Sequence, residues 1–314
     1  MTDADTFRAC TEAESGWLRG SYHDLIVKRP LLIALTIGVG IAAAAPTAFK
    51  RAFRPPWREV HQTPLDFDLP EDQVWFDGAN GIRLHGWFIP VQGTAPAVVV
   101  LHGWGGNAAH MLEMAPPLHE AGFHALFLDA RNHGLSDHDT YASMPRFAED
   151  LAVAVGYLHE RDDVATVGVI GHSVGAGAAI YHASSVDDLD AVVAVSCFAH
   201  PGEMMQANFP FPAAVTWGIL RGVEVLIGRS LDAIAPRNRI GRVRAPVMLV
   251  HGDVDEVVSV GDAYELADCS PDSRLIIVPD GTHSDLAAFG PYFPEVMDFL
   301  VAHLAGKHRE ATAR

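Results

Sequence analysis

From about residue 73 onward, short apolar runs alternate with segments of helix length. Six runs are rich in β-branched residues and carry almost no charge. They occupy residues 97–101, 124–130, 166–171, 191–196, 246–252 and 274–279. Strands this uniformly apolar are typical of a parallel sheet that is buried on both faces. Because the runs alternate with helix-length segments, the pattern predicts a doubly wound α/β fold.

Two stretches depart from this rhythm. Residues 74–90 read VWFDGANGIRLHGWFIP, in which an Asn-Gly pair separates two short β-prone segments and predicts a hairpin. Residues 199–244 form an interval that is too long for a simple crossover. Several large apolar residues lie in it: Met204, Met205, Phe209, Phe211 and Trp217. An ordinary crossover helix with a loop is one interpretation, but we favour an inserted cap over the C-terminal edge of the sheet, where open α/β folds bind ligands.

Residues 31–49 contain no charge and read LLIALTIGVGIAAAAPTAF. As a helix this run would span about 28 Å, close to the ~30 Å hydrocarbon core of a bilayer. Basic residues flank it on both sides: Lys28, Arg29, Lys50, Arg51 and Arg54. The pattern predicts a single transmembrane helix after a polar segment of residues 1–30. A cleaved signal peptide and a helix packed on the soluble domain are the alternatives, the second because the run is rich in alanine and contains Pro46.

The flanking charges and the overall composition refine this organisation. Basic residues are slightly more numerous on the C-terminal side of the apolar run, which favours a cytoplasmic catalytic domain. We expect a linker at 50–72, a catalytic domain at 73–305 and a tail at 306–314. The 49% of hydrophobic residues suffices for a large core, and the net charge of −17 argues against a nucleic-acid partner. The three cysteines form no CxxC pair and no disulfide framework.

The strongest chemical signal is the sequence Gly171-His172-Ser173-Val174-Gly175. It follows one of the apolar runs directly, and an alanine-rich segment of helix length comes after it. G-x-S-x-G between a strand and a helix is the pattern of a nucleophile elbow. In such an elbow the serine occupies a strained turn that exposes its hydroxyl, and the glycines let strand and helix approach closely. The pattern therefore predicts Ser173 as a nucleophile.

A serine hydroxyl needs a neighbouring base to act as a nucleophile at neutral pH. For this elbow the partners follow in the order acid, then histidine. Asp253 and Asp255 come directly after the fifth apolar run, and His283 comes after the sixth. All three thus follow the C-terminal ends of predicted strands, at the edge where Ser173 is expected. We predict Asp255 as the acid because it fits the spacing HG-x-x-D-x-x-V, whereas Asp253 is typical of a turn residue that binds nearby amides.

The remaining requirement is a set of backbone N–H groups that stabilise the oxyanion. The first apolar run ends in His102-Gly103-Trp104-Gly105-Gly106, a glycine-rich loop at the same sheet edge. We expect the amides of Trp104 and Val174 to be the donors. A phosphate-binding loop does not fit, because the motif lacks the G-K-[ST] of a Walker sequence and the G-x-G-x-x-G of a dinucleotide fold.

In their order and spacing, HGWGG, DARNHGLSD, GHSVG, HGDVDEVV and GTH resemble the motifs of the α/β-hydrolase superfamily, over about residues 73–304. The hairpin followed by HGWGG is similar to bacterial hydrolases related to serine aminopeptidases and monoacylglycerol lipases. This resemblance implies an eight-stranded, mostly parallel sheet with a small helical cap after the sixth strand. It also implies hydrolysis through an acyl-enzyme on Ser173 without a metal or organic cofactor, and a structural turn at Arg131 and His133.

Three functional hypotheses follow. The first is hydrolysis of a small-molecule carboxylic ester with a small or lipid-like acyl group, which suits both the apolar cap and the membrane segment. The second keeps the triad but acts on amides or peptides, or transfers the acyl group. The third is a catalytically silent binding protein, and the presence of all three triad residues argues against it.

Overall fold

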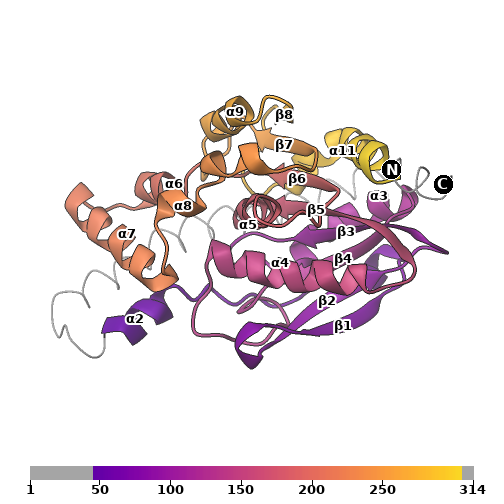
Figure 1. The fold of residues 1–314 in the computed structure, drawn as a ribbon, viewed down its shortest axis with the longest axis horizontal. Coiled ribbons are helices and arrows are strands. Elements are labelled where there is room, and N and C mark those ends of the chain that lie inside the picture. Colours follow the sequence, from indigo (N-terminus) through magenta and orange to yellow (C-terminus); the bar gives the residue numbers. More distant parts are fainter. Residues whose placement is uncertain (1–44, 306–314) are drawn as a thin grey trace, which may run out of the picture.

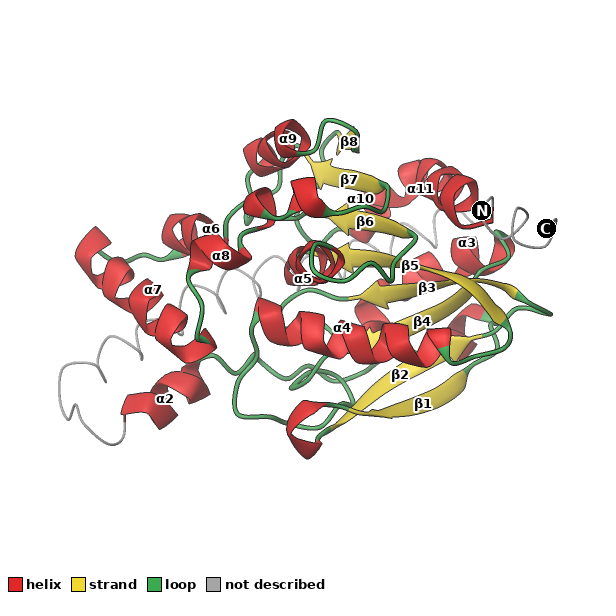
Figure 2. Ribbon diagram, viewed as in Figure 1, coloured by secondary structure: helices red, strands yellow, loops and turns green. Residues whose placement is uncertain are grey.

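The computed structural model describes residues 45–305 of the chain, and an eight-stranded sheet lies at its centre (Figure 1, Figure 2). The strands are β1 (Asp72–Asp77), β2 (Arg83–Ile89), β3 (Ala95–Leu101), β4 (His124–Asp129), β5 (Val164–His172), β6 (Ala191–Val195), β7 (Val247–Gly252) and β8 (Arg274–Val278). Their spatial order is β1-β2-β4-β3-β5-β6-β7-β8. Only the β1–β2 and β2–β4 pairs are antiparallel. The predicted doubly wound, mostly parallel sheet is confirmed, and the six apolar runs correspond to β3–β8.

Helices cover both faces of this sheet (Figure 2). One layer contains α4 (Met144–His159), α5 (Val174–Ala183) and α9 (Val260–Cys269), and the other contains α3 (Ala115–Glu120) and α11 (Phe293–Leu300). Alternate residues of each central strand point to opposite layers, so that Val99 packs toward α4 and α5 while Val98 and Val100 pack toward α3 and α11. Burial on both faces explains why these strands are apolar throughout.

Shorter helical segments connect these elements. They are η1 (Pro64–Phe67), η2 (Ala79–Gly81), η3 (Ala108–Met114), η4 (Pro236–Asn238), η5 (Ile240–Arg242), α10 (Leu286–Phe289), η6 (Gly290–Tyr292) and η7 (Val301–Ala305). The turn η2 closes the predicted hairpin, because Asn80 and Gly81 adopt φ values of 62° and 73° there. These positive angles are the reason that an Asn-Gly pair marks the position.

Three helices lie between β6 and β7, beyond the C-terminal edge of the sheet: α6 (Pro201–Asn208), α7 (Ala213–Ile227) and α8 (Leu231–Ile234) (Figure 1). They confirm the predicted cap rather than a single crossover helix. The cap stands above the end of the sheet at which β5 passes into α5. It therefore covers the edge where the sequence places the nucleophile.

The predicted transmembrane helix falls mainly outside the described residues. Residues 31–44, like the predicted segments 1–30 and 306–314, are not among them. Residues 45–49 belong to α2 (Ala45–Ala52), a short helix that lies beside α7 (Figure 1). Within residues 45–305, no helix combines the length and the apolar character needed to cross a bilayer.

Candidate active site

Ser173 occupies the sharp turn between β5 and α5, with φ 53° and ψ −115°. A non-glycine residue rarely adopts such a conformation, and the surrounding structure has to hold it there. The Ser173 N–H donates to the carbonyl of Val195 at 2.8 Å. A Cβ atom at Gly171 would lie 2.5 Å from the carbonyl oxygen of Gly175, and one at Gly175 would lie 2.5 Å from that of Leu101. Both glycines of the motif are thus required by close backbone contacts.

The structure brings the three predicted triad residues together. The Ser173 hydroxyl lies 3.0 Å from Nε2 of His283, and Nδ1 of His283 lies 2.8 Å from Oδ2 of Asp255. An ionised carboxylate only accepts hydrogen bonds, so Nδ1 carries the proton in the neutral imidazole and Nε2 is left to accept from the serine. Ser173 and His283 are both buried. This is the geometry that a general base and its nucleophile need.

Four polar groups surround the carboxylate of Asp255. Its Oδ1 accepts from the N–H groups of Val257 and Val258 at 2.9 and 2.8 Å, and its Oδ2 faces His283. Nε2 of His251 lies 3.4 Å from the same Oδ2. Burial raises the pKa of Asp255, but the hydrogen bond to His283, its charge and the two amides outweigh burial and leave the pKa below its usual value. The carboxyl group of Asp255 is therefore ionised at neutral pH.

Asp253 has the other role that the sequence left open. It is exposed, and its Oδ1 accepts the backbone N–H of Asp280 at 2.7 Å. Asp280 itself has φ 56°, so this carboxylate stabilises the turn that follows β8. His283 follows the same turn, and its side chain contacts Asp255 rather than Asp253.

Two buried histidines hold the glycine-rich loop after β3. His102 donates to the carbonyl of Gly103 at 2.7 Å and accepts the Ala130 N–H at 3.1 Å. Nε2 of His133 accepts the Gly105 N–H at 3.1 Å. Burial is the main cause that lowers the pKa of His102 to about 3 and that of His133 to about 4. Both rings are thus neutral and structural, as the family resemblance implied for His133.

The loop that these histidines hold carries Trp104, one of the two predicted oxyanion donors. Trp104, Val174 and Ser173 line the same cavity. The placement of both residues beside the serine is compatible with the predicted oxyanion role, which stays a prediction.

The remaining polar residues near the motifs serve packing. His172 is buried, and it donates to the backbone carbonyl of His283 at 2.7 Å instead of lining the cavity. His251 donates to the carbonyl of Val258 at 3.0 Å. The fully buried guanidinium of Arg131 binds the buried carboxylate of Asp150 at 2.6 Å, as expected for a structural turn.

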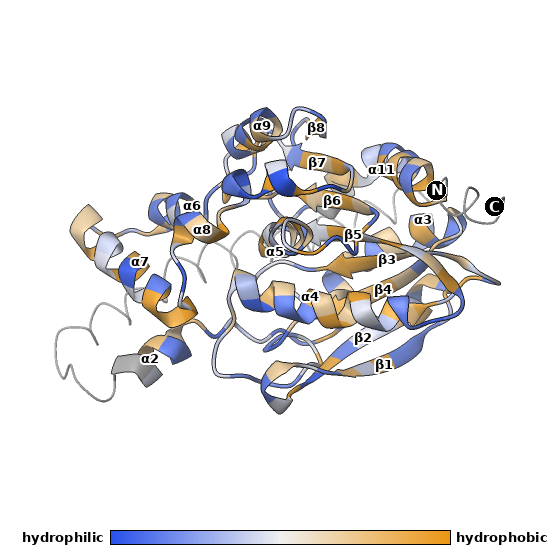
Figure 3. Cartoon of the chain, in the orientation of Figure 1, coloured by the Kyte–Doolittle hydropathy of each residue, from blue (hydrophilic) through white to orange (hydrophobic). Residues whose placement is uncertain are grey.

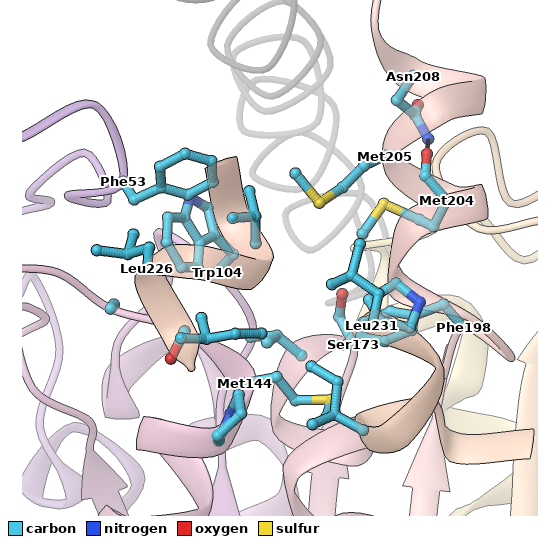
Figure 4. A pocket seen from close by; sticks show the side chains of 18 of the residues that line it. Phe53, Trp104, Met144, Ser173, Phe198, Met204, Met205, Asn208, Leu226 and Leu231 are labelled. Carbon is cyan, nitrogen blue, oxygen red and sulfur yellow. Dashed lines mark hydrogen bonds between the residues drawn. The ribbon is translucent and has the colours of Figure 1, made fainter. Parts of the chain in front are cut away.

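A cavity of about 250 Å³ opens above Ser173 (Figure 4). Apolar side chains from β6 onward and from the cap form most of its wall: Phe198, Met204, Met205, Phe209, Ile219, Val223, Leu226, Ile227, Leu231 and Ile234. Phe53 and Trp104 close the side opposite Met204 and Met205 (Figure 4). Such a lining suits a hydrocarbon group attached to a carbonyl at the serine.

Part of this wall was missed by sequence reasoning. Residues 52–58 fall in the predicted linker, yet Ala52, Phe53, Arg54, Pro56 and Arg58 line the cavity. A Cβ atom at Gly105 would lie 3.0 Å from the ring of Pro56, so this segment packs closely on the glycine-rich loop. The aromatic and proline residues of this segment are the one signal in the sequence that it packs against the catalytic domain and is not a free linker.

The sheet order, the strained serine turn and the cap are the arrangement found in α/β hydrolases. The model of the family described as serine aminopeptidase, S33, matches residues 92–231. The α/β-hydrolase domain-containing protein WAV2 of Arabidopsis thaliana is 26% identical over 271 residues, which cover 80% of this chain and 85% of that protein. An uncharacterized protein of Mycobacterium tuberculosis is 30% identical over 224 residues, which cover 70% of this chain and 72% of the relative.

Solved structures agree with this fold. The esterase Pf2001 of Pyrococcus furiosus has a TM-score of 0.65 and 24% identity, over 80% of this chain and 99% of its own. Est1E of Butyrivibrio proteoclasticus, solved with ferulic acid, has a TM-score of 0.61 and 20% identity, over 73% and 99%. The chain belongs to the α/β-hydrolase superfamily.

Proposed function

We propose that this protein hydrolyses a carboxylic ester through an acyl-enzyme on Ser173. The observation that carries the proposal is the continuous chain from Asp255 through His283 to Ser173, with the serine hydroxyl at the floor of an apolar cavity. These three hydrogen-bonded residues supply the nucleophile and its base, and the cavity supplies a binding site for an acyl group.

The first half of the reaction uses the proton positions described above. Nε2 of His283 takes the proton of Ser173 as Oγ attacks the ester carbonyl. The ionised Asp255 stabilises the imidazolium that forms. The amides of Trp104 and Val174 bind the oxyanion of the tetrahedral intermediate. His283 then gives its proton to the leaving alcohol, and the acyl group remains on Ser173.

The second half repeats these steps with water. His283 takes a proton from water, whose oxygen attacks the acyl-enzyme carbonyl. The tetrahedral intermediate collapses, the proton returns to Ser173 and the carboxylic acid leaves. If an alcohol entered in place of water, the same triad would transfer the acyl group to that alcohol, and the protein would be an acyltransferase.

Peptide hydrolysis is the second candidate, because the matching family model is described as serine aminopeptidase. An aminopeptidase has to bind the ammonium group of its substrate, which calls for a carboxylate near the serine. Among the described residues, the cavity lining contains Arg54 and Arg58 but no aspartate or glutamate. This charge balance favours an uncharged acyl group over an N-terminal ammonium.

Matched substrates test the proposal. We expect p-nitrophenyl esters to be hydrolysed, and the corresponding p-nitroanilides and aminoacyl anilides to be hydrolysed far more slowly. Ser173→Ala should abolish ester turnover while the folded protein keeps its circular dichroism spectrum. Faster turnover of an aminoacyl anilide than of the matched ester would instead establish a peptidase.

For the cellular location we propose single-pass membrane anchoring through residues 31–49, with the catalytic domain on the cytoplasmic side. The uncharged run and its basic flanks support this. The full chain should stay in the membrane pellet after carbonate extraction. Its catalytic domain should resist protease added to intact cells. Release of the full chain by carbonate would refute the anchor.

A further inference from the structure

The cap helix α7 is apolar on two opposite sides. On its inner side, Ile219, Val223 and Leu226 face the cavity. On its outer side, Trp217 and Val225 are 64% and 84% exposed. Figure 3 shows hydrophobic residues toward both ends of α7 and hydrophilic ones between them. Large apolar side chains that a helix exposes on the side away from the core are typical of a surface that contacts a partner or a membrane.

The segment beside this outer side is basic. α2 lies against α7, and a Cβ atom at Gly222 would lie 2.8 Å from the ring of Phe49, so the two helices are in close contact. Residues 45–58 contain four cations and no acidic residue. They are Lys50, Arg51, Arg54 and Arg58. The chain has a net charge of −17, and residues 237–244 are a second stretch with four cations and no acidic residue. In that second stretch Arg237 and Arg244 form ion pairs with Glu203 and Asp187.

Arg221 on α7 continues the same pattern. Its guanidinium lies 5.7 Å from the centre of the Trp217 ring and 2.6 Å from a carboxylate oxygen of Glu224. The exposed side of α7 thus combines tryptophan and valine with an arginine. Helices that lie in a membrane interface have this composition, with apolar residues in the acyl boundary and arginine or lysine at the head groups.

We propose that the outer side of α7, together with α2, rests on an anionic lipid bilayer. The proposal rests on the membrane anchor and ester substrate proposed above. A bilayer is favoured over a second copy of this chain because the cations of 45–58 would repel their own copies and attract anionic head groups. In addition, the predicted membrane segment 31–49 ends within α2, which places its C-terminal end at α7.

This orientation has a consequence for the substrate. Both helices that would touch the lipid, α2 and α7, also contribute residues to the wall of the cavity. An acyl ester would then pass from the bilayer into the cavity beside these helices without crossing water. The substrate class that fits is an ester partitioned into the membrane, rather than one dissolved in the aqueous phase.

A fluorescent probe tests the docking surface in the full chain. The thiol-reactive dye NBD is attached at Val225→Cys in a background with Cys10→Ser and Cys269→Ser. Cys197 is retained, because burial raises the pKa of its thiol and prevents labelling. The matched control is Val186→Cys, which is 48% exposed in the wild type and lies in the loop before β6, at the opposite edge of the sheet from the cap.

Each labelled protein is reconstituted into vesicles of phosphatidylcholine and phosphatidylglycerol that carry doxyl-labelled lipid as quencher. We expect the probe at 225 to be quenched about threefold more than the probe at 186, because an interfacial helix lies within ~10 Å of the acyl boundary. Equal quenching at the two positions, or none at 225, would overturn the proposal. So would shielding of the 225 probe by a second copy in detergent, seen together with a dimer. None of these readouts depends on turnover.

A variant links the surface to activity. Trp217→Gln with Val225→Gln removes apolar surface outside the cavity, so hydrolysis of water-soluble p-nitrophenyl acetate should be unchanged. Hydrolysis of a long-chain ester embedded in the vesicles should fall about tenfold, as expected when the enzyme loses contact with the interface. If both rates fell together, the outer side of α7 would be part of the fold and the proposal would be wrong. If p-nitrophenyl acetate were not hydrolysed even by the wild type, the proposed ester hydrolysis would fail while the probe result still stood.

Discussion

Replacement of Asp255 by asparagine tests how His283 is oriented. In the native site Oδ1 of Asp255 accepts from two backbone amides, and Oδ2 accepts from Nδ1 of His283. In the variant, the asparagine carbonyl oxygen keeps the two amides because it alone can accept from them. The NH₂ group then faces His283. The imidazole can satisfy this donor only by moving its proton from Nδ1 to Nε2.

That change of tautomer removes the base. With its proton on Nε2, His283 no longer accepts the proton of Ser173, which lies 3.0 Å away. The corresponding substitution in serine proteases lowers kcat by about 10⁴-fold. This loss equals about 5 kcal/mol of transition-state stabilisation. The fold should tolerate the change because both amides stay paired.

The matched control is Asp253→Asn. Its carbonyl oxygen can still accept the Asp280 N–H, which is the contact that Asp253 makes in the native turn. We expect less than about a threefold change in kcat/KM, typical of an exposed residue away from the chemistry. Both variants are assayed on one p-nitrophenyl ester, with thermal unfolding as the check on folding. Asp255→Asn within tenfold of wild type, or a greater loss for Asp253→Asn, would show that Asp255 does not orient His283.

Three further predictions concern the elbow, the cavity and pH. Gly175→Ala should destabilise the protein by about 3 kcal/mol because the new methyl group meets two backbone carbonyls. The control Gly218→Ala, on the open side of α7, should be neutral or slightly stabilising. Equal urea midpoints for the two variants would contradict this. Met205→Trp should fill part of the cavity and lower kcat/KM for octanoyl esters at least tenfold while acetyl esters are retained; an equal loss for both esters would place Met205 outside the acyl site. Burial lowers the pKa of His102 and of His172 to about 3, so only the unfolded chain takes up these protons below about pH 6.5. The free energy of unfolding should therefore be greatest above that pH and should fall from pH 6.5 toward pH 3, by up to about 1.4 kcal/mol per pH unit for each histidine. A urea midpoint that did not change between pH 7 and pH 5 would show that these rings are not held neutral.

The sheet and the elbow were predictable because their signals are local. Strands buried on both faces have to be apolar at every position, and the turn at Ser173 requires Gly171 and Gly175 through backbone contacts. The positions of His283 and the two aspartates followed from one rule, that residues after parallel strands meet at one edge. The spacing of the motif favoured Asp255 over Asp253 although both follow the same strand, and in the structure Asp255 is the one that contacts His283.

The cavity wall was less predictable because it depends on contacts between distant segments. Residues 52–58 meet the cap only in three dimensions, and periodicity along the chain carries no signal of that contact. In the cap, composition marked Met204, Met205, Phe209 and Trp217 alike. The structure turns the first three toward the cavity and leaves Trp217 64% exposed, because α7 is apolar on both sides and its pattern does not fix which side faces inward.

The most direct test of the central claim is fluorophosphonate labelling of the purified full chain, read by intact mass. We expect a single adduct on the wild-type protein and none on Ser173→Ala, because only a serine activated by His283 attacks the phosphorus at neutral pH. An adduct that persisted in Ser173→Ala would place the nucleophile elsewhere. The absence of any adduct on folded wild-type protein would contradict the activated serine and point to a protein that binds its ligand without cleaving it.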